Sequence, residues 1–322
     1  MEYFKNIIGQ DKTINKLKKI IDSDNISHAY LFIGKSGIGK MLTARAFSNI
    51  IINKDDKSAQ IYLKDNIHPD LLIIEKKDNK TVVTKEQITQ ELESWIAVKP
   101  YRAKRKIAII RDSHLMSLEA SNALLKTLEE PPPYASIILI ADENNLLETI
   151  ISRCQAIRFN SVTEDKIEAY LTNKLNNKEN APIIACLSQG SLANAIMLAE
   201  ENKFEKLIQD TEEIIKALSK GQNIAIFEAA EKIEADIPLI ASCIETILRD
   251  IYIYKKTQDE QIVLIKNSIK IAKQVPNLTL ESMSKAINNI NKLKRKTRNN
   301  INPMLIGINI SYELFDAFIK KQ

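Results

Sequence analysis

The chain has 322 residues, of which 44% are apolar and 27% are charged, and its net charge is +5. This length and composition are typical of two or three globular domains and exclude a fibrous or disordered chain. The three cysteines lie far apart, which excludes a disulfide framework and a zinc site made of closely spaced cysteines. We find no signal peptide and no apolar run of about 18 residues, so we expect a cytoplasmic protein without a membrane span.

The first half of the sequence alternates between helical and strand patterns. Residues 5–22 carry apolar side chains at helical spacing, and the apolar run 29–34 that follows predicts a buried strand. A strong helical pattern at 120–130 ends at three consecutive prolines. Further buried strands are predicted at residues 71–75, 106–112 and 136–142. The alternation predicts an α/β domain with a mostly parallel sheet covered on both faces.

From Thr163 onward the sequence shows helical patterns only. Two short helices are expected to meet near Gly190, and about five amphipathic segments follow. We therefore predict three domains: an α/β domain at 1–161, a small helical domain at 162–204 and a larger all-helical domain at 205–322.

Three of the seven glycines lie in one loop, GKSGIGKM, directly after a predicted strand and before a predicted helix. This is the G-x-x-x-x-G-K pattern of a phosphate-binding loop in the context that the motif requires. Glycines let successive amides converge on phosphate oxygens, and the helix N-terminus and a lysine add positive charge. We expect nucleotide contacts from Gly34, Lys35, Ser36, Gly37, Ile38, Gly39, Lys40 and Met41.

The positions that would hold Mg²⁺ are altered. A loop of this kind ends in Ser or Thr, whose hydroxyl binds the metal, whereas Met41 offers a soft thioether. After the strand at 106–110, Arg111 stands where an acidic metal ligand is expected, and Asp112 stands in the position of the general base. We expect a degenerate site that requires no cofactor and binds no metal, although ATP or ADP can bind there without hydrolysis. If Arg111 faces the loop, its charge would replace that of Mg²⁺.

Five motifs cover much of the first 200 residues: NIIGQ (6–10), HAYLFIGKSGIGK (28–40), HPDL (68–71), ASNALLKTLEEPP (120–132) and ISRC (151–154). Together they resemble the AAA+ clamp-loader subunits of bacterial DNA polymerase III. The resemblance implies an AAA+ domain, a helical lid and a C-terminal collar for oligomerisation. It also implies a five-membered ring with gamma/tau and delta subunits, which opens the sliding clamp and places it on primer-template DNA.

The resemblance assigns a further role to Arg153, because Ser152-Arg153-Cys154 matches the SRC motif of the family. The arginine of that motif reaches ATP bound in the neighbouring subunit, where a planar guanidinium suits the charge of the γ-phosphate. A structural salt bridge is the alternative role for this side chain.

Two sensor positions of active family members are also altered, to Ala141 and Ala193. With Met41 and Arg111 they make four losses at hydrolytic positions, while Arg153 is retained. This combination favours a stator-like subunit that assists hydrolysis by its neighbour and does not hydrolyse ATP itself. The alternatives are an ATP-hydrolysing motor of the gamma/tau type, a related AAA+ helicase, and a P-loop phosphotransferase acting on a nucleoside.

Two other features of the sequence concern possible zinc and DNA binding. Many relatives carry four cysteines before HPDL that form a zinc module, but residues 49–67 contain none, so we predict no zinc. A run of basic residues near the end of the chain is more typical of a solvated helix face than of a DNA-binding patch. The run consists of Lys292, Lys294, Arg295, Lys296 and Arg298.

Overall fold

The computed structural model describes residues 2–64, 67–77, 80–142, 146–174, 179–275, 278–296 and 302–319. The chain divides into two compact units. The first contains Met1–Lys166 and Ser191–Ala193, and the second contains Ile167–Gly190 and Asn194–Gln322. Most of both predicted helical domains lies in the second unit, and the boundary between residues 204 and 205 stays a prediction.

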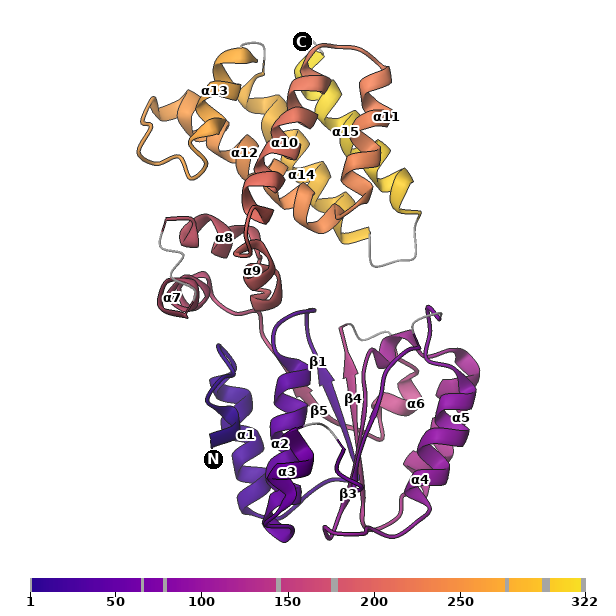
Figure 1. Ribbon diagram of the computed structural model, residues 1–322. Helices are drawn as coiled ribbons and strands as arrows, with labels where there is room; N and C mark the ends of the chain where they lie inside the picture. Colours follow the sequence, from indigo (N-terminus) through magenta and orange to yellow (C-terminus); the bar gives the residue numbers. More distant parts are fainter. Residues whose placement is uncertain are drawn as a thin grey trace. The chain divides into compact units, whose positions relative to one another are not determined.

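The first unit is built on a five-stranded sheet with the order β2-β3-β4-β1-β5 (Figure 1). All four strand pairings are parallel. The strands are β1 (Ala29–Ile33), β2 (Leu71–Ile74), β3 (Lys106–Ile110), β4 (Ala135–Ala141) and β5 (Gln155–Arg158). The first four confirm the predicted strands. Because the strands are parallel, the loops that follow β1, β3 and β4 meet at one edge of the sheet.

Helices cover both faces of the sheet (Figure 1). One face carries α1 (Asp11–Asp22), α2 (Lys40–Asp55) and α3 (Ala59–Lys64); the other carries the π-helical segment Gln87–Glu93, α4 (Ser94–Ile96), α5 (Leu118–Glu129) and α6 (Glu148–Ile151). Alternate residues of β1 enter the two cores, with Phe32 on the α2 side and Leu31 on the α5 side. This arrangement confirms the predicted α/β fold with a parallel sheet.

The first long helix starts later than the sequence pattern predicts. The pattern begins at residue 5, but α1 begins at Asp11. Gly9 has a φ of +76°, and a Cβ at this position would lie 2.8 Å from a methyl group of Val162. The chain therefore needs glycine and a turn here, and the helix follows the turn.

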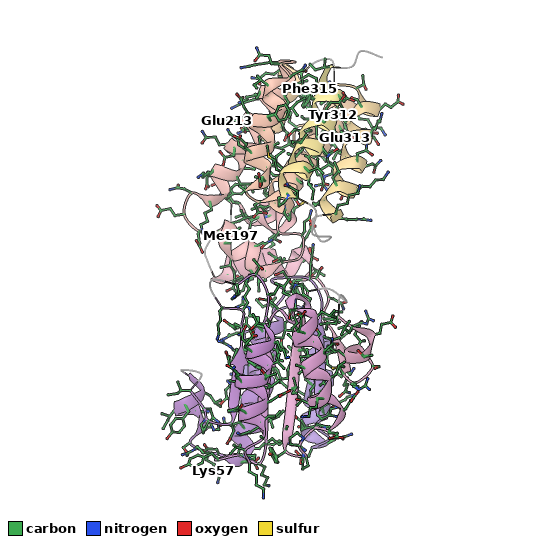
Figure 2. All side chains as sticks on the ribbon, turned by 90° about the vertical axis from the view of Figure 1, so that its right-hand side faces the viewer. Lys57, Met197, Glu213, Tyr312, Glu313 and Phe315 are labelled. Carbon is green, nitrogen blue, oxygen red and sulfur yellow. The ribbon has the colours of Figure 1, made fainter. Side chains whose placement is uncertain are left out.

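The described residues of the second unit form helices joined by turns and loops, with no strand among them. Its helices are α8 (Ala181–Leu187), α9 (Leu192–Leu198), α10 (Lys203–Ser219), α11 (Ile224–Glu234), α12 (Ile237–Thr257), α13 (Asn267–Gln274), α14 (Leu280–Lys296) and α15 (Pro303–Ile319). Helix α7 (Glu164–Lys174) crosses the boundary of the two units, and so does the start of α9, because Leu192 and Ala193 belong to the first unit. The short helices α8 and α9 flank Gly190, as predicted. Figure 2 shows Tyr312 and Phe315 on α15, which packs closely against α11 through Gly307 and Ala230.

Four members of the basic run lie on α14, and one of these, Lys294, is part of the interior. Lys294 forms an ion pair with Glu245 of α12, and both side chains are nearly buried, with 12% and 13% exposed. Arg298 lies outside the described residues. None of the described helices is both long and apolar enough to cross a bilayer.

Candidate functional site

The loop between β1 and α2 has a backbone suited to phosphate binding. Gly37 and Gly39 have φ angles of +73° and +98°, which favour glycine. Gly34 allows the backbone of Phe159 to approach, since a Cβ here would lie 2.6 Å from the carbonyl oxygen of that residue. Helix α2 begins at Lys40, so its N-terminus meets the loop. Of the remaining loop residues, Lys35 is half-buried, Ser36 is exposed and Ile38 is buried in the core.

Lys40 is bound by groups of its own chain. Its side chain is 5% exposed, and its Nζ forms an ion pair with Oδ1 of Asp142 at 2.7 Å. The same Nζ donates hydrogen bonds to the carbonyl oxygens of Gly34 and Lys35, both at 2.6 Å. The three N–H groups of the ammonium thus have three acceptors. A nucleotide phosphate that engages Lys40 has to displace at least one of them.

The positions expected to hold a metal do not offer one a site. Met41 is half-buried and packs against the core beside α2. Arg111 Nη1 lies 3.2 Å from Oε1 of Glu75, which follows β2, and its Nε lies 3.6 Å from Oδ2 of Asp112. In the sheet order, β2 lies on the side of β3 away from β4 and β1. The charge of Arg111 is therefore paired on the side away from the loop, which does not support its suggested role in place of Mg²⁺.

The two altered sensor positions both contact the loop through the backbone. The carbonyl oxygen of Ala141 accepts a hydrogen bond from the amide of Gly34 at 3.3 Å, and the amide of Ala193 donates to the carbonyl of Gly37 at 3.0 Å. A Cβ on Gly37 would lie 2.1 Å from Oγ of Ser191. The segment 191–193 therefore packs directly on the loop. Neither alanine brings a polar side chain to the site.

Arg153 lies at the opposite edge of the sheet from the loop. It comes just before β5, whose Gln155 pairs with Tyr30 of β1. Gly34 lies four residues beyond Tyr30, which is about 13 Å at about 3.3 Å per residue. Nη2 of Arg153 donates to Oε1 of Glu129 at 2.7 Å, and Nη1 donates to the carbonyl oxygen of Thr149 at 2.9 Å. The structure thus does not bring Arg153 to the loop of its own chain.

Cys154, the residue that follows Arg153, does not have a reactive thiol. Cys154 is half-buried and packs against the core beneath α5 and α6. Burial raises the pKa of its thiol to about 12. The thiol therefore stays protonated at neutral pH, and Cys154 serves to anchor the segment.

Comparisons with known proteins identify the family. A family model described as DNA polymerase III, delta subunit, matches residues 9–163. The DNA polymerase III subunit tau/gamma of Haemophilus influenzae is 30% identical over 214 residues, which are 62% of this chain and 30% of that protein. The DNA polymerase III subunit delta' of Bacillus subtilis is 29% identical over 226 residues, 68% of each chain. Over the matched residues 9–163 the sequence is that of the DNA polymerase III subunit family.

The extent of these similarities differs between relatives. The chain spans 30% to 58% of the length of the first three gamma and tau relatives, which is less than two thirds of each. A solved structure of a gamma subunit-related protein from Thermotoga maritima aligns with 94% of this chain and 99% of that chain, at 17% identity and a TM-score of 0.44.

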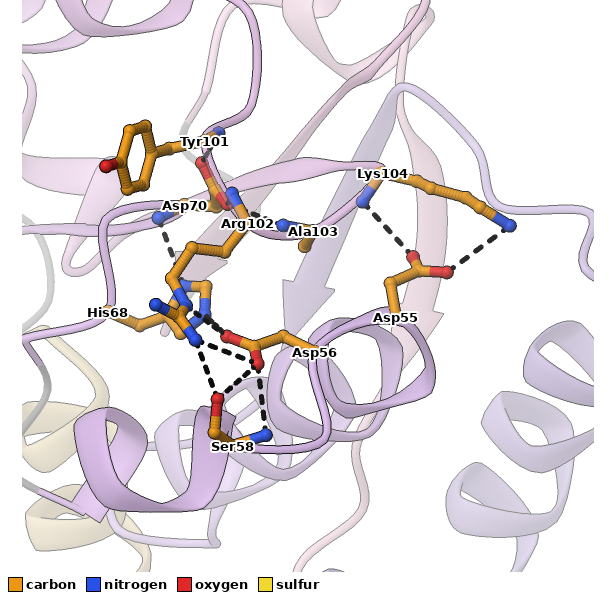
Figure 3. A network of polar contacts seen from close by, with 9 residues as sticks. All are labelled: Asp55, Asp56, Ser58, His68, Asp70, Tyr101, Arg102, Ala103 and Lys104. Atoms are coloured by element: carbon orange, nitrogen blue, oxygen red, sulfur yellow. Dashed lines mark hydrogen bonds and ion pairs between the residues drawn. The ribbon is translucent and has the colours of Figure 1, made fainter.

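A polar network connects Asp56, Ser58, His68 and Asp70 to the loop before β3 (Figure 3). The buried carboxylate of Asp56 accepts hydrogen bonds from Arg102 Nε at 2.5 Å and Ser58 Oγ at 2.8 Å, and Nε2 of His68 lies 3.3 Å from it. Asp70 accepts from the backbone amides of residues 101–103. The Arg102 guanidinium, with help from Ser58, holds the pKa of Asp56 well below its usual range. Within the described ranges, no three His, Cys, Asp or Glu side chains are arranged to hold a metal.

Three residues that matter here were not predicted from the sequence. Gln10 of NIIGQ is buried, and its Nε2 donates to the carbonyls of Ile38 at 3.2 Å and Asn160 at 2.7 Å. Gln10 thus joins the phosphate-binding loop to the segment that follows β5. Asp142 binds Lys40, and Glu129 binds Arg153. Asp142 carried a signal, since it is an acidic residue directly after a buried strand at the carboxyl edge of a parallel sheet.

Proposed function

We propose that this chain is a stator-like clamp-loader subunit of the delta-prime type, which does not hydrolyse ATP itself. The proposal rests on the residues in and around the loop between β1 and α2, which do not offer the groups that ATP hydrolysis needs. Lys40 is neutralised by Asp142, and the two metal-ligand positions hold a core-packed Met41 and a paired Arg111. Phosphoryl transfer depends on positioned phosphates and a metal that neutralises developing charge. The similarity to the delta' subunit of Bacillus subtilis supports the same role.

In this proposal the contribution of the chain to hydrolysis comes from Arg153. Arg153 lies at the edge of the sheet opposite the phosphate-binding loop of its own chain, and its side chain is 35% exposed. A neighbouring subunit that docks at this edge would present its ATP to the guanidinium, which would stabilise the negative charge on the γ-phosphate. Arg153 is thus the arginine finger that acts in trans.

The partners follow from the same proposal. The chain assembles with gamma/tau and delta subunits in a heteropentameric ring in the cytoplasm, and the domain at 205–322 serves as the collar. Through the ring it takes part in loading the sliding clamp onto primer-template DNA. The site requires no cofactor for this role, and ATP or ADP that enters it is bound without hydrolysis.

A steady-state ATPase assay of the purified chain, with and without primed DNA, tests the proposal. We expect no turnover above a control in which Lys40 is replaced by Met. The similarity to tau and gamma subunits favours the alternative, a hydrolysing motor of the gamma/tau type. Turnover at about 1 s⁻¹ or more, in the range of ordinary enzymes, that disappears in Lys40→Met would support that alternative and overturn the proposal.

A further inference from the structure

Arg153 is held in place by one side chain and one carbonyl group. Its ion pair with Glu129 joins the loop before β5 to the last residue of α5, and the second contact is to Thr149 in α6. The backbone beside Arg153 is already fixed, because Ile151 and Cys154 both pack against the core. What remains to be set is the direction of the long side chain. Glu129 supplies the side-chain contact to the guanidinium.

The two contacts leave the guanidinium able to bind a phosphate. A guanidinium has five N–H donors in a rigid planar fork, and the contacts with Glu129 and Thr149 use one donor from each terminal nitrogen. The pair is also open to solvent, with 35% of Arg153 and 51% of Glu129 exposed. An incoming phosphate therefore meets a charged group that is already oriented and not fully occupied. Because arginine otherwise loses much rotamer freedom on binding, a held side chain binds at a lower entropic cost.

The position of Glu129 is locally unfavourable, which points to a role beyond helix stability. Glu129 is the last residue of α5, and Glu130 follows it. The C-terminus of a helix carries a partial negative charge and favours basic residues. An acidic residue at this point opposes the helix dipole, and such local conflicts in a sequence are expected mainly where function requires them.

We propose that Glu129 is a positioning residue for the trans-acting arginine: it holds the Arg153 side chain in the orientation that meets the nucleotide of the neighbouring subunit. The proposal rests on the trans role of Arg153 given above. It names a residue that acts only through Arg153 and does not touch the nucleotide.

The test uses the complete chain assembled with its partner subunits, and it measures DNA-stimulated ATP hydrolysis. We expect Glu129→Ala to lower kcat about two- to fivefold, which is the range that an exposed ion pair can supply. KM for ATP should stay unchanged, because ATP binds in the neighbour. Glu130→Ala is the matched control: it removes the same charge one residue away, and we expect wild-type rates. Thermal unfolding of each variant checks that the fold is retained.

The double variant Glu129→Ala/Arg153→Ala decides between positioning and a general effect on the fold. If Glu129 acts through Arg153, its removal has no further effect once Arg153 is absent. Equal slowing by Glu129→Ala in both backgrounds, or a rate at or above wild type in Glu129→Ala alone, would overturn the inference and leave the trans role of Arg153 intact. Wild-type rates in Arg153→Ala alone would instead overturn the proposed function, and this inference with it.

Discussion

The ion pair between Lys40 and Asp142 makes a specific prediction about nucleotide affinity. Asp142 occupies one of the three donors of the lysine ammonium, and the two side chains are 5% and 29% exposed. A phosphate has to replace the carboxylate, and it also meets the negative charge of the carboxylate nearby. Replacing Asp142 with Ala removes both obstacles, and the two carbonyl acceptors of Lys40 remain.

The size of the effect follows from the strength of that contact. A hydrogen bond to a charged group contributes about 1.5–3 kcal/mol. Since about 1.4 kcal/mol corresponds to a tenfold change in affinity, Asp142→Ala should bind ADP about 10- to 100-fold more tightly than the wild type. Asp112→Ala removes an acidic side chain that lies at the same edge of the sheet but is not bound to Lys40, and it should leave the affinity unchanged.

Calorimetric titration with ADP measures this change, with Lys40→Met/Asp142→Ala as the control that binding occurs at the loop. Circular dichroism and thermal unfolding establish that each variant is folded. If folded Asp142→Ala binds ADP no more tightly than the wild type, the ion pair does not limit access to the loop and the reasoning is wrong.

Three further predictions concern stability, each measured by urea unfolding. Because Arg102 holds the pKa of Asp56 below its usual range, the pair stabilises the protein above the ordinary aspartate pKa of about 3.9 and loses this effect as the pH falls further. Arg102→Ala should therefore be less stable than the wild type at pH 7, and the difference should narrow below about pH 4; a constant difference would contradict this account. Lys294→Ala leaves the nearly buried Glu245 without its partner and should lower the free energy of unfolding by about 3–5 kcal/mol. Lys292 is exposed, so Lys292→Ala should change the free energy of unfolding by less than about 0.5 kcal/mol. Gly37→Ala should lower the free energy of unfolding by about 1–3 kcal/mol more than Gly39→Ala does, because only at Gly37 would the added Cβ meet Ser191 and Ala193. Equal losses of stability in the two variants would show that the 191–193 segment does not pack tightly on the loop.

The sequence predicts the elements of the sheet well where burial is continuous. Strands β1, β3 and β4 are buried at every position, which produces unbroken apolar runs. Strand β5 was not predicted, because it lies at the edge of the sheet and only Ile157 of its four residues is buried. An edge strand of this kind leaves no apolar run and no clear alternation to detect.

The site was predictable only as far as its motif extends. The loop at 34–41 was found because its residues are adjacent in the sequence and their spacing has a physical reason. The partners of its charged side chains lie far away along the chain: Asp142 is 102 residues from Lys40, and Glu129 is 24 residues from Arg153. The strand order places β4 beside β1 and so brings Asp142 to Lys40, and no local pattern specifies that order.

In the proposed function, this chain acts through Arg153 on the nucleotide of a neighbour and not through Lys40 on its own nucleotide. The most direct test is single-turnover ATP hydrolysis by the assembled ring on primed DNA, comparing chains that carry Arg153→Ala or Lys40→Met with the wild type. We predict that Arg153→Ala slows hydrolysis at the adjacent site by at least about tenfold, a lower bound on the roughly 10³- to 10⁵-fold that an arginine finger can supply. We predict that the Lys40→Met ring hydrolyses ATP at the wild-type rate. The opposite pattern, a slow Lys40→Met ring and a normal Arg153→Ala ring, would contradict the account.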